Sequence, residues 1–275
     1  MDLSKQTGFP FDFDFLTWEL NYQKDLFELV HSRIFTINAS TLSKYYLNPV
    51  AVLINKVYAT FWLRGKAGIW ADMPFKFKFT VLNKDYVGIE TIKTKSIYTG
   101  KHGRLIEILY GNVGVLFFPP DLIENGGASA DNNVFLAILQ TGSKFIIPSN
   151  YVYVLINITP SEPAIILEIH HIEDSAHKLF VKGKGGPLYY VLRNTSHEVV
   201  KNPRYRFVNS YVKLGKGIEN LLKGYGISPK TPILKQLGRK YVKYNWLLQK
   251  EKTENLINKF LEISDSFIDF SHPTF

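Results

Sequence analysis

Residues 142–163 show the clearest hydrophobic pattern in the chain: a short apolar run, a turn and a longer apolar run. The first run ends at Pro148, and residues 148–150 have turn chemistry. Residues 151–156 are β-branched or aromatic at both odd and even positions, which is typical of a strand covered on both faces. The pattern predicts two strands that line the inside of a sandwich or barrel.

The same pattern of apolar runs and turns extends over the middle of the chain. In residues 75–82 three phenylalanines alternate with Lys76, Lys78 and Thr80, so the two sets point to opposite faces. Strands are predicted at 50–62, 75–82, 86–98, 104–110, 113–118, 134–140, 144–147, 151–158 and 164–170. Many short strands with few helices indicate a mainly β fold, a sandwich or a small barrel.

Helical periodicity occurs towards both ends. Within residues 19–35, apolar side chains at Leu26, Phe27, Val30 and Ile34 have the spacing of one helix face. Near the C-terminus, Thr231 and Pro232 predict the start of a helix that runs to about residue 249. A second helix is predicted from a Thr253 cap to about residue 267, which makes an αα-hairpin. Its apolar side would cover the mouth or outer sheet of the barrel, or join two subunits.

Composition narrows the class of protein. The chain has 275 residues, is 45% hydrophobic and 15% aromatic, and contains no cysteine. It can therefore bury a core, but it has no disulfide, no thiolate metal site and no cysteine nucleophile. No signal-peptide pattern opens the sequence and no apolar run approaches 18 residues, so we expect a cytoplasmic protein.

The net charge of +9 is concentrated near the C-terminus. Residues 201–252 hold 13 Lys and Arg against two acids, Glu219 and Glu251, a surplus of 11. A basic face with Tyr241, Tyr244 and Trp246 is one hypothesis for nucleic-acid binding. The other interpretation, which we favour because no helix-turn-helix unit is visible, is a solvated basic face.

Four motifs in order point to a family. They are Thr80-Val81-Leu82 followed by Gly88-x-Glu90 and Thr94-Lys95, then Leu109-x-Gly111-x-x-Gly114-x-Leu116, then Ser161-Glu162-Pro163, and finally Asn202-Pro203-Arg204-Tyr205. With residues 142–163, they resemble the cupin superfamily, and more narrowly the archaeal cupin-type, metal-dependent glucose-6-phosphate isomerases. The resemblance implies a jelly-roll (double-stranded β-helix) barrel at residues 48–206. It would lie between an N-terminal extension, 1–47, with one helix, and a basic helical extension, 207–275. It also implies a homodimer.

The family's metal ligands are not present at the matching positions. The resemblance places two histidines at Ile97 and Thr99, a glutamate at Arg104 and a third histidine at Tyr153. Isoleucine and arginine cannot ligate a cation, so we predict no metal in the barrel and no cofactor. A rebuilt site that uses His102 and Glu107 would break the glycine match and supply only one histidine.

A phosphate-binding pocket could remain without the metal. In the family, threonines that match Thr80 and Thr94 contact the substrate phosphate, and Arg104 would add a guanidinium that suits phosphate or carboxylate. With Tyr153, they are the predicted substrate-binding residues. The alternative is that both threonines are ordinary strand residues and Arg104 is an exposed strand charge.

Three functions follow. The first is a non-catalytic binder or sensor of a phosphorylated or acidic small molecule. The second is an active sugar-phosphate isomerase with a rebuilt site, and the third is a nucleic-acid-binding protein that uses the basic C-terminal helices.

Adjacent His170 and His171 end a predicted strand and should face opposite sides, so they cannot chelate one ion together.

Overall fold

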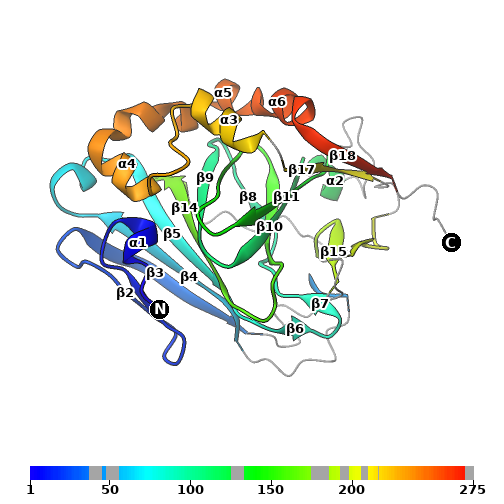
Figure 1. Cartoon of the computed structure of the whole chain (residues 1–275), viewed down its shortest axis with the longest axis horizontal. Coiled ribbons are helices and arrows are strands. Elements are labelled where there is room, and N and C mark those ends of the chain that lie inside the picture. The colour runs from blue at the N-terminus through cyan, green and yellow to red at the C-terminus, as the bar shows by residue number, and fades with distance from the viewer. Residues whose placement is uncertain are drawn as a thin grey trace.

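The computed structural model describes residues 1–36, 45–47, 56–124, 133–174, 186–192, 198–205, 210–215 and 217–269. Two six-stranded sheets form the body, and helices from the C-terminal part lie across one end of it (Figure 1). The predicted domain boundary at Asn48, the start of the strand predicted at 50–62 and the boundary at Arg206 lie outside the described residues. None of the described helices is long and apolar enough to cross a membrane.

The first sheet is antiparallel throughout. Its strand order is β12 (Lys144–Ile147), β9 (Arg104–Tyr110), β14 (Ala164–His171), β5 (Phe75–Leu82), β4 (Lys56–Gly65) and β3 (Phe27–Thr36). The second sheet has the order β18 (Ser264–Asp269), β17 (Ser210–Leu214), β11 (Phe135–Gln140), β10 (Asn112–Phe118), β13 (Val152–Asn157) and β8 (Ile97–Tyr98). Only the β11–β17 pairing is parallel among the described strands.

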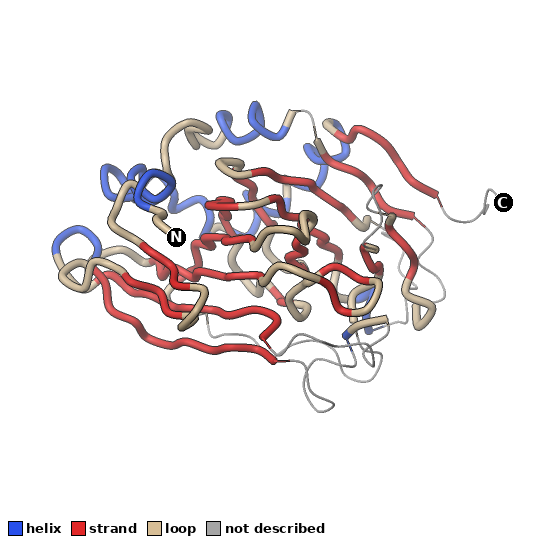
Figure 2. The backbone as a smooth tube through the Cα atoms, turned by 60° about the horizontal axis from the view of Figure 1, so that its bottom comes forward, coloured by secondary structure: helices blue, strands red, loops and turns tan. Residues whose placement is uncertain are grey.

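The central strands follow the order of a jelly roll. Between β5 and β14 the chain crosses repeatedly from one sheet to the other, giving β12-β9-β14-β5 in one and β11-β10-β13-β8 in the other. The prediction of a mainly β fold is confirmed. A closed barrel is not what the structure shows, because the described strands form two separate sheets rather than one hydrogen-bonded ring (Figure 2).

The strand prediction at 86–98 joined three short strands into one. The structure has β6 (Tyr86–Val87), β7 (Glu90–Thr91) and β8, with a left-handed turn at Gly88 (φ 66°) between the first two. A residue with a side chain is strained in that conformation, so the glycine ends the strand. Further small elements are α2 (Asp121–Glu124) and the paired strands β15 (Tyr189–Val191) and β16 (Val199–Lys201).

Both faces of the first sheet are covered at β5, and the alternation in this strand explains how. Phe77 and Phe79 lie on the outer face, where Phe27 and Phe11 pack against them with ring centroids 5.6 and 4.9 Å away. The N-terminal segment supplies this cover through α1 (Ser4–Thr7), β1 (Asp12–Asp14) and β2 (Glu19–Asn21), joined by the short 3₁₀ helix η2 (Gly68–Trp70). The inner face of β5 carries the polar side chains.

The predicted helix within residues 19–35 is wrong. Those residues form β2 and the long strand β3, which pairs with β4. Of the apolar residues that suggested a helix face, Phe27 is buried, whereas Val30 is 59% and Ile34 is 40% exposed. Pairing with β4 satisfies the backbone groups along one side of β3, and this outweighs a weak helical pattern.

The predicted αα-hairpin is also corrected. The C-terminal part contains α3 (Ile218–Gly224), α4 (Ile233–Lys240), the 3₁₀ helix η3 (Tyr241–Leu248), α5 (Lys250–Glu254) and α6 (Leu256–Glu262), and it ends in β18. A helix does start here, at Ile233, but Pro232 rather than Thr231 is its N-cap residue. Thr253 does not cap a helix; it is buried inside α5 and donates to the Ser149 hydroxyl (2.8 Å).

These helices are bound to the end of the sandwich. Glu107 on β9 pairs with Lys144 on β12 (2.8 Å), and its second oxygen accepts the N–H of Ile233 at the start of α4 (2.8 Å). Phe260 of α6 stacks on Phe145 of the first sheet (5.3 Å) and meets Phe117 of the second (5.6 Å). The C-terminal helices therefore close the space between the two sheets at this end.

Candidate functional site

A buried carboxylate, Glu168, joins the polar side chains inside the sandwich. On the neighbouring strand β5, Lys78 lies opposite Glu168 in register, and its ammonium is 2.7 Å from Oε1. Thr80 donates to the same oxygen (2.6 Å), and Tyr153 of the other sheet donates to Oε2 (2.5 Å). The cluster thus links three strands of both sheets through one side chain that is not exposed to solvent.

Burial and neighbouring charges determine the protonation state of the ionisable residues around Glu168. Burial raises the pKa of the Glu168 carboxyl, but Lys78 and His170 more than reverse this and hold the pKa far below its ordinary value. Burial and the neighbouring carboxylate raise the pKa of Tyr153 well above its ordinary value. Burial, reinforced by the Arg104 charge, lowers the pKa of His170 to about 3. Glu168 is therefore an anion beside a neutral phenol and a neutral imidazole.

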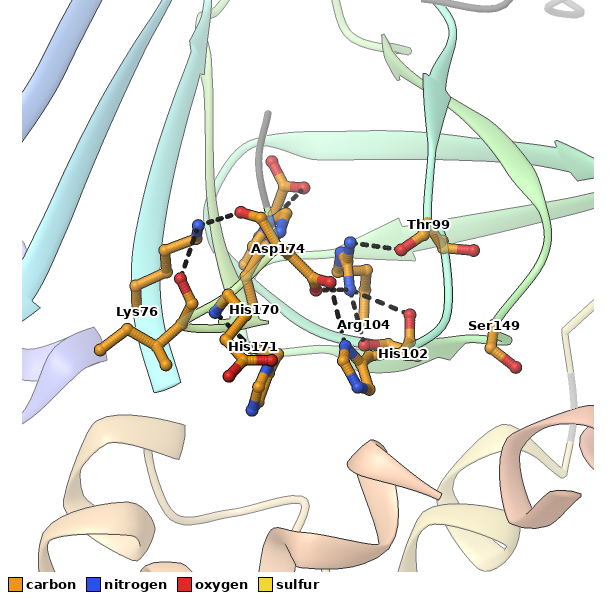
Figure 3. A network of polar contacts seen from close by, with 12 residues as sticks. Lys76, Thr99, His102, Arg104, Ser149, His170, His171 and Asp174 are labelled. Carbon is orange, nitrogen blue, oxygen red and sulfur yellow. Dashed lines mark hydrogen bonds and ion pairs between the residues drawn. The ribbon is translucent and has the colours of Figure 1, made fainter. Parts of the chain in front are cut away.

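A second buried charge, Arg104, makes a separate chain of polar contacts that leads to the surface. It is 2% exposed, and its guanidinium donates to the carbonyls of Thr99 (2.5 Å) and His102 (2.9 Å). It also pairs with Asp174 Oδ2 (2.6 Å) (Figure 3). Burial raises the pKa of Asp174, but Arg104 and His102 outweigh it, and the pKa lies below its ordinary value. The interpretation of Arg104 as an exposed strand charge is wrong.

Two histidines meet Asp174 at the surface end of this chain of contacts. His102 Nδ1 lies 2.9 Å from Asp174 Oδ1, and the His102 and His171 ring centroids are 4.3 Å apart. Lys76 donates to the carbonyls of Ile172 (3.2 Å) and Asp174, which holds the loop after β14 in place. Figure 3 shows these side chains grouped beside the C-terminal helices.

An open cavity of about 810 Å³ lies next to this group. It is formed by the β8–β9 loop, the turn before β13, the loop after β14 and the C-terminal helices. Its lining includes Tyr98, Lys101, His102, Asn150, Asp174 and Lys250. We call it the mouth cavity. The Tyr98 hydroxyl donates to Asn150 Oδ1 across it.

The four predicted substrate-binding residues do not form one pocket. Thr80 and Tyr153 meet at Glu168, and Arg104 lies in the separate chain of contacts that leads to the mouth cavity. Thr94 lies against β13: its hydroxyl accepts the N–H of Leu155 (3.1 Å) and its own N–H donates to the Leu155 carbonyl (2.9 Å).

The residues at the metal positions that the resemblance implies do not fit a divalent ion. Ile97 offers no donor atom, and the Thr99 hydroxyl bridges the backbone of Tyr151. Arg104 is a cation, and the Tyr153 phenol already donates to Glu168. The nearest interior carboxylate, Glu168, has the Lys78 ammonium against it, so a cation already occupies its coordination space.

The sequence did not predict the group that His102, His171 and Asp174 form beside the mouth cavity. His102 was considered only as part of a rebuilt metal site with Glu107, and Asp174, which is 72 positions further along the chain, was not considered. The expectation that His170 and His171 face opposite sides is confirmed, since His170 lies 3.4 Å from Glu168 in the interior while His171 faces His102. No local pattern signals that the ends of β14 and of the β8–β9 loop meet.

Comparison with known proteins finds similar solved structures but no match by sequence. No protein-family model and no curated protein matches the sequence. Among solved structures, vicilin from Corylus avellana (hazelnut) is 12% identical, with a TM-score of 0.36 over 57% of this chain and 34% of that one. A Bacillus subtilis oxalate decarboxylase is 10% identical, with a TM-score of 0.32 over 46% and 28% of the two chains.

A third similar structure is the Schizosaccharomyces pombe Cnp3 cupin domain, 12% identical with a TM-score of 0.28 over 41% and 64% of the chains. The alignments thus span less than two thirds of each of these three chains. With every TM-score below 0.5, these similarities establish neither a family nor a function, and the jelly-roll order rests on the strand pairing itself.

Proposed function

We propose that this chain is a cupin-like binding protein for an acidic small molecule, phosphorylated or carboxylic, and that the ligand sits in the mouth cavity. The supporting observation is the lining of that cavity. Lys101 and Lys250 contribute ammonium groups, and His102 and Asn150 contribute further polar groups. Concave sites with a few converging polar groups are the usual form of a small-molecule site.

The balance of charge at the cavity favours an anion. Its lining carries two acids, Glu173 and Asp174, but Asp174 is already paired with the buried Arg104. The lining also holds Lys101 and Lys250, and the contact that Lys250 makes with Glu254 (3.5 Å) lies at the surface. A phosphate or carboxylate would therefore find ammonium groups that are not held by a buried partner among the described residues.

The interior cluster has a structural role in this proposal. Thr80 and Tyr153 donate to Glu168 and are fully buried, so we assign them to holding the two sheets together rather than to the ligand. Arg104 acts one layer behind the cavity, because it positions Asp174 and the carbonyl of His102. Of the four predicted substrate-binding residues, Arg104 is the one whose contacts reach the cavity wall.

The two alternative functions receive less support. An isomerase needs a base that can accept a proton from substrate, but Glu168, the carboxylate of the interior cluster, is engaged by Lys78, Thr80 and Tyr153. For nucleic acid, two of the three aromatic side chains that would stack on bases, Tyr244 and Trp246, are only 2% and 9% exposed, and the third, Tyr241, is half-buried. Both remain predictions from the sequence.

Thermal unfolding in buffer with a metal chelator tests the proposal. The probes are glucose 6-phosphate, inorganic phosphate and, as the uncharged comparison, glucose, each at millimolar concentration. A ligand present at 100 times its Kd stabilises the native state by about 2.7 kcal/mol, and for a chain of this size each kcal/mol is worth roughly 2–4 °C. We expect the acidic probes to raise the Tm and glucose to leave it unchanged.

Variants locate the binding. Lys101→Gln and Lys250→Gln remove the two ammonium groups that line the cavity, and we expect each to reduce the shift and the double variant to abolish it. Lys84→Gln is the matched control, an exposed lysine that does not line the mouth cavity. The proposal fails if no acidic probe shifts the Tm, or if the double variant responds as the unmodified protein does.

A further inference from the structure

Three groups that ligate metals converge at the edge of the mouth cavity: His102 from the β8–β9 loop, His171 from the end of β14, and Asp174 from the loop that follows. One nitrogen of each histidine and one carboxylate oxygen of Asp174 all lie within 4.8 Å of one another. His102 Nδ1 and Asp174 Oδ1 are 2.9 Å apart.

This spacing suits a single small cation. Nitrogen and oxygen ligands bind first-row divalent ions at about 2.0–2.2 Å, so donor atoms of one ion stand roughly 3–4 Å from each other. Two imidazoles and one carboxylate are a ligand set that Zn²⁺ and Fe²⁺ use in proteins. We propose that His102, His171 and Asp174 form a binding site for a divalent first-row transition-metal ion.

The residues behind the ligands hold them in place. Arg104 takes Asp174 Oδ2 (2.6 Å) and leaves Oδ1 directed at His102. The same guanidinium binds the carbonyl of His102 (2.9 Å), so one buried side chain positions two of the three ligands. Lys76 donates to the carbonyls of Ile172 and Asp174, and so fixes the backbone of the loop that follows His171. Such outer contacts orient ligands in metal sites.

The site is closed on one side and open on the other. The side chains of Asp174, His171 and His102 are 5%, 13% and 18% exposed, so all three are largely desolvated. His102 and Asp174 also line the mouth cavity. An ion held by three protein ligands would keep its remaining positions facing that cavity, where water or an exogenous ligand can bind.

The site differs from the one that the family resemblance implied. That site lies at Ile97, Thr99, Arg104 and Tyr153, and its residues do not fit a cation. The proposed site uses none of them as ligands, although Arg104 supports Asp174. It is also independent of the acidic-ligand proposal, whose test is done in chelator, so either proposal can fail while the other holds.

Metal binding is tested with the full-length, tag-free protein and the metal alone. Protein stripped with chelator is titrated with Co²⁺, followed by visible absorption, and with Zn²⁺, followed by calorimetry and elemental analysis. We expect one equivalent of either ion per chain and Co²⁺ bands that show nitrogen and oxygen ligation. His102→Ala, His171→Ala and Asp174→Asn should each weaken binding by at least about 100-fold, since even the loss of an outer-shell contact costs roughly 10–100-fold.

A histidine outside the group serves as the control for the metal-binding experiment. His31→Ala removes an exposed histidine outside the group and should bind as the unmodified protein does. The Tm of every variant without metal shows whether it is folded. If a ligand variant does not fold, the zinc anomalous signal in crystals of the unmodified protein decides, with a peak expected about 2.0–2.2 Å from all three ligands. No binding, undiminished binding in folded variants, or an anomalous peak elsewhere overturns the proposal.

Discussion

Lys78 and Glu168 show how one residue pair defines the interior of this sandwich. The anion accepts contacts from an ammonium and two hydroxyl groups, so its charge is balanced without solvent. A buried ion pair is costly to form but far more costly to break, because one charge is then left without a partner. The pair therefore acts as a constraint on how the two sheets meet, through Tyr153.

Single substitutions in this pair should be strongly destabilising. Lys78→Met leaves Glu168 without its cation, and Glu168→Leu leaves Lys78 without its anion, and each should cost about 3–5 kcal/mol in free energy of unfolding. The double variant should be more stable than either single variant, since no charge is stranded. Urea denaturation measures all four proteins, and strictly additive losses would show that the pair is not coupled.

A second buried pair, Lys93 and Glu90, gives a pH dependence. Lys93 Nζ contacts Glu90 Oε1 and lies over the rings of Tyr46 (3.7 Å) and Tyr190 (5.1 Å). Burial, only partly offset by Glu90, lowers the pKa of Lys93 from 10.5 to about 8. Between pH 8 and 10.5 the unfolded chain then binds more protons at this residue than the folded one, so this contribution to stability rises with pH.

The measurement compares the protein with a Lys93→Met, Glu90→Gln double variant. Other lysines and tyrosines also titrate in this range, so the difference between the two curves is what counts. From pH 8 to 10.5 the free energy of unfolding of the unmodified protein should rise relative to that of the variant. A parallel pair of curves would show that Lys93 titrates normally.

At the scale of residues, the sequence determines which side chains share a face but not which partners they meet. Alternation in β5 places Lys78 and Thr80 together, opposite the phenylalanines, as predicted. Their common partner Glu168 is 88 positions beyond Thr80, and only the pairing of β5 with β14 brings it near. The same holds for His102 and Asp174, whose contact depends on two loops that no local pattern relates.

At the scale of elements, strands were far easier to predict than helices. The predicted ranges 75–82, 104–110 and 144–147 match β5, β9 and β12, because turns with Gly or Pro delimit apolar runs that are buried on both faces. The segment that became β3 is exposed on most of its length, so its apolar spacing carried little information. In the C-terminal part, periodicity gave the start of α4 but not the change to a 3₁₀ helix or the final strand.

The C-terminal helices are integral to the sandwich, and Phe260 tests this. Its ring packs against Phe145, Phe117 and Phe135 from both sheets. Phe260→Ala should leave a cavity and lower the free energy of unfolding by about 3–5 kcal/mol. The neighbouring Leu261 is 42% exposed, and Leu261→Ala should change the free energy of unfolding by no more than about 0.5 kcal/mol. Equal effects in denaturant titrations would mean that α6 is only loosely attached.

At the scale of the whole molecule, one sheet ends in a strand with exposed apolar side chains. β3 is the last strand of its sheet, and Leu29, Val30 and Ile34 are 42%, 59% and 40% exposed. Edge strands of this kind pair readily with another chain. We expect the predicted homodimer to form along β3, with light scattering giving twice the mass of the chain. Val30→Lys should yield monomers, while Lys84→Gln should not, and a monomeric unmodified protein would contradict the prediction.

The arrangement of the whole molecule also bears on where we propose that the ligand binds. The polar cluster around Glu168 lies between the sheets, the C-terminal helices close one end, and the cavity lies where loops, sheet ends and helices meet. We propose that the acidic ligand binds at this cavity.

A crystal structure of the unmodified protein grown with glucose 6-phosphate tests that claim most directly. We predict density for the sugar phosphate in the mouth cavity, with its phosphate within hydrogen-bond distance of Lys101 and Lys250. Sugar phosphate bound between the sheets at Thr80 and Tyr153, or an empty mouth cavity in crystals grown at saturating ligand, would contradict it.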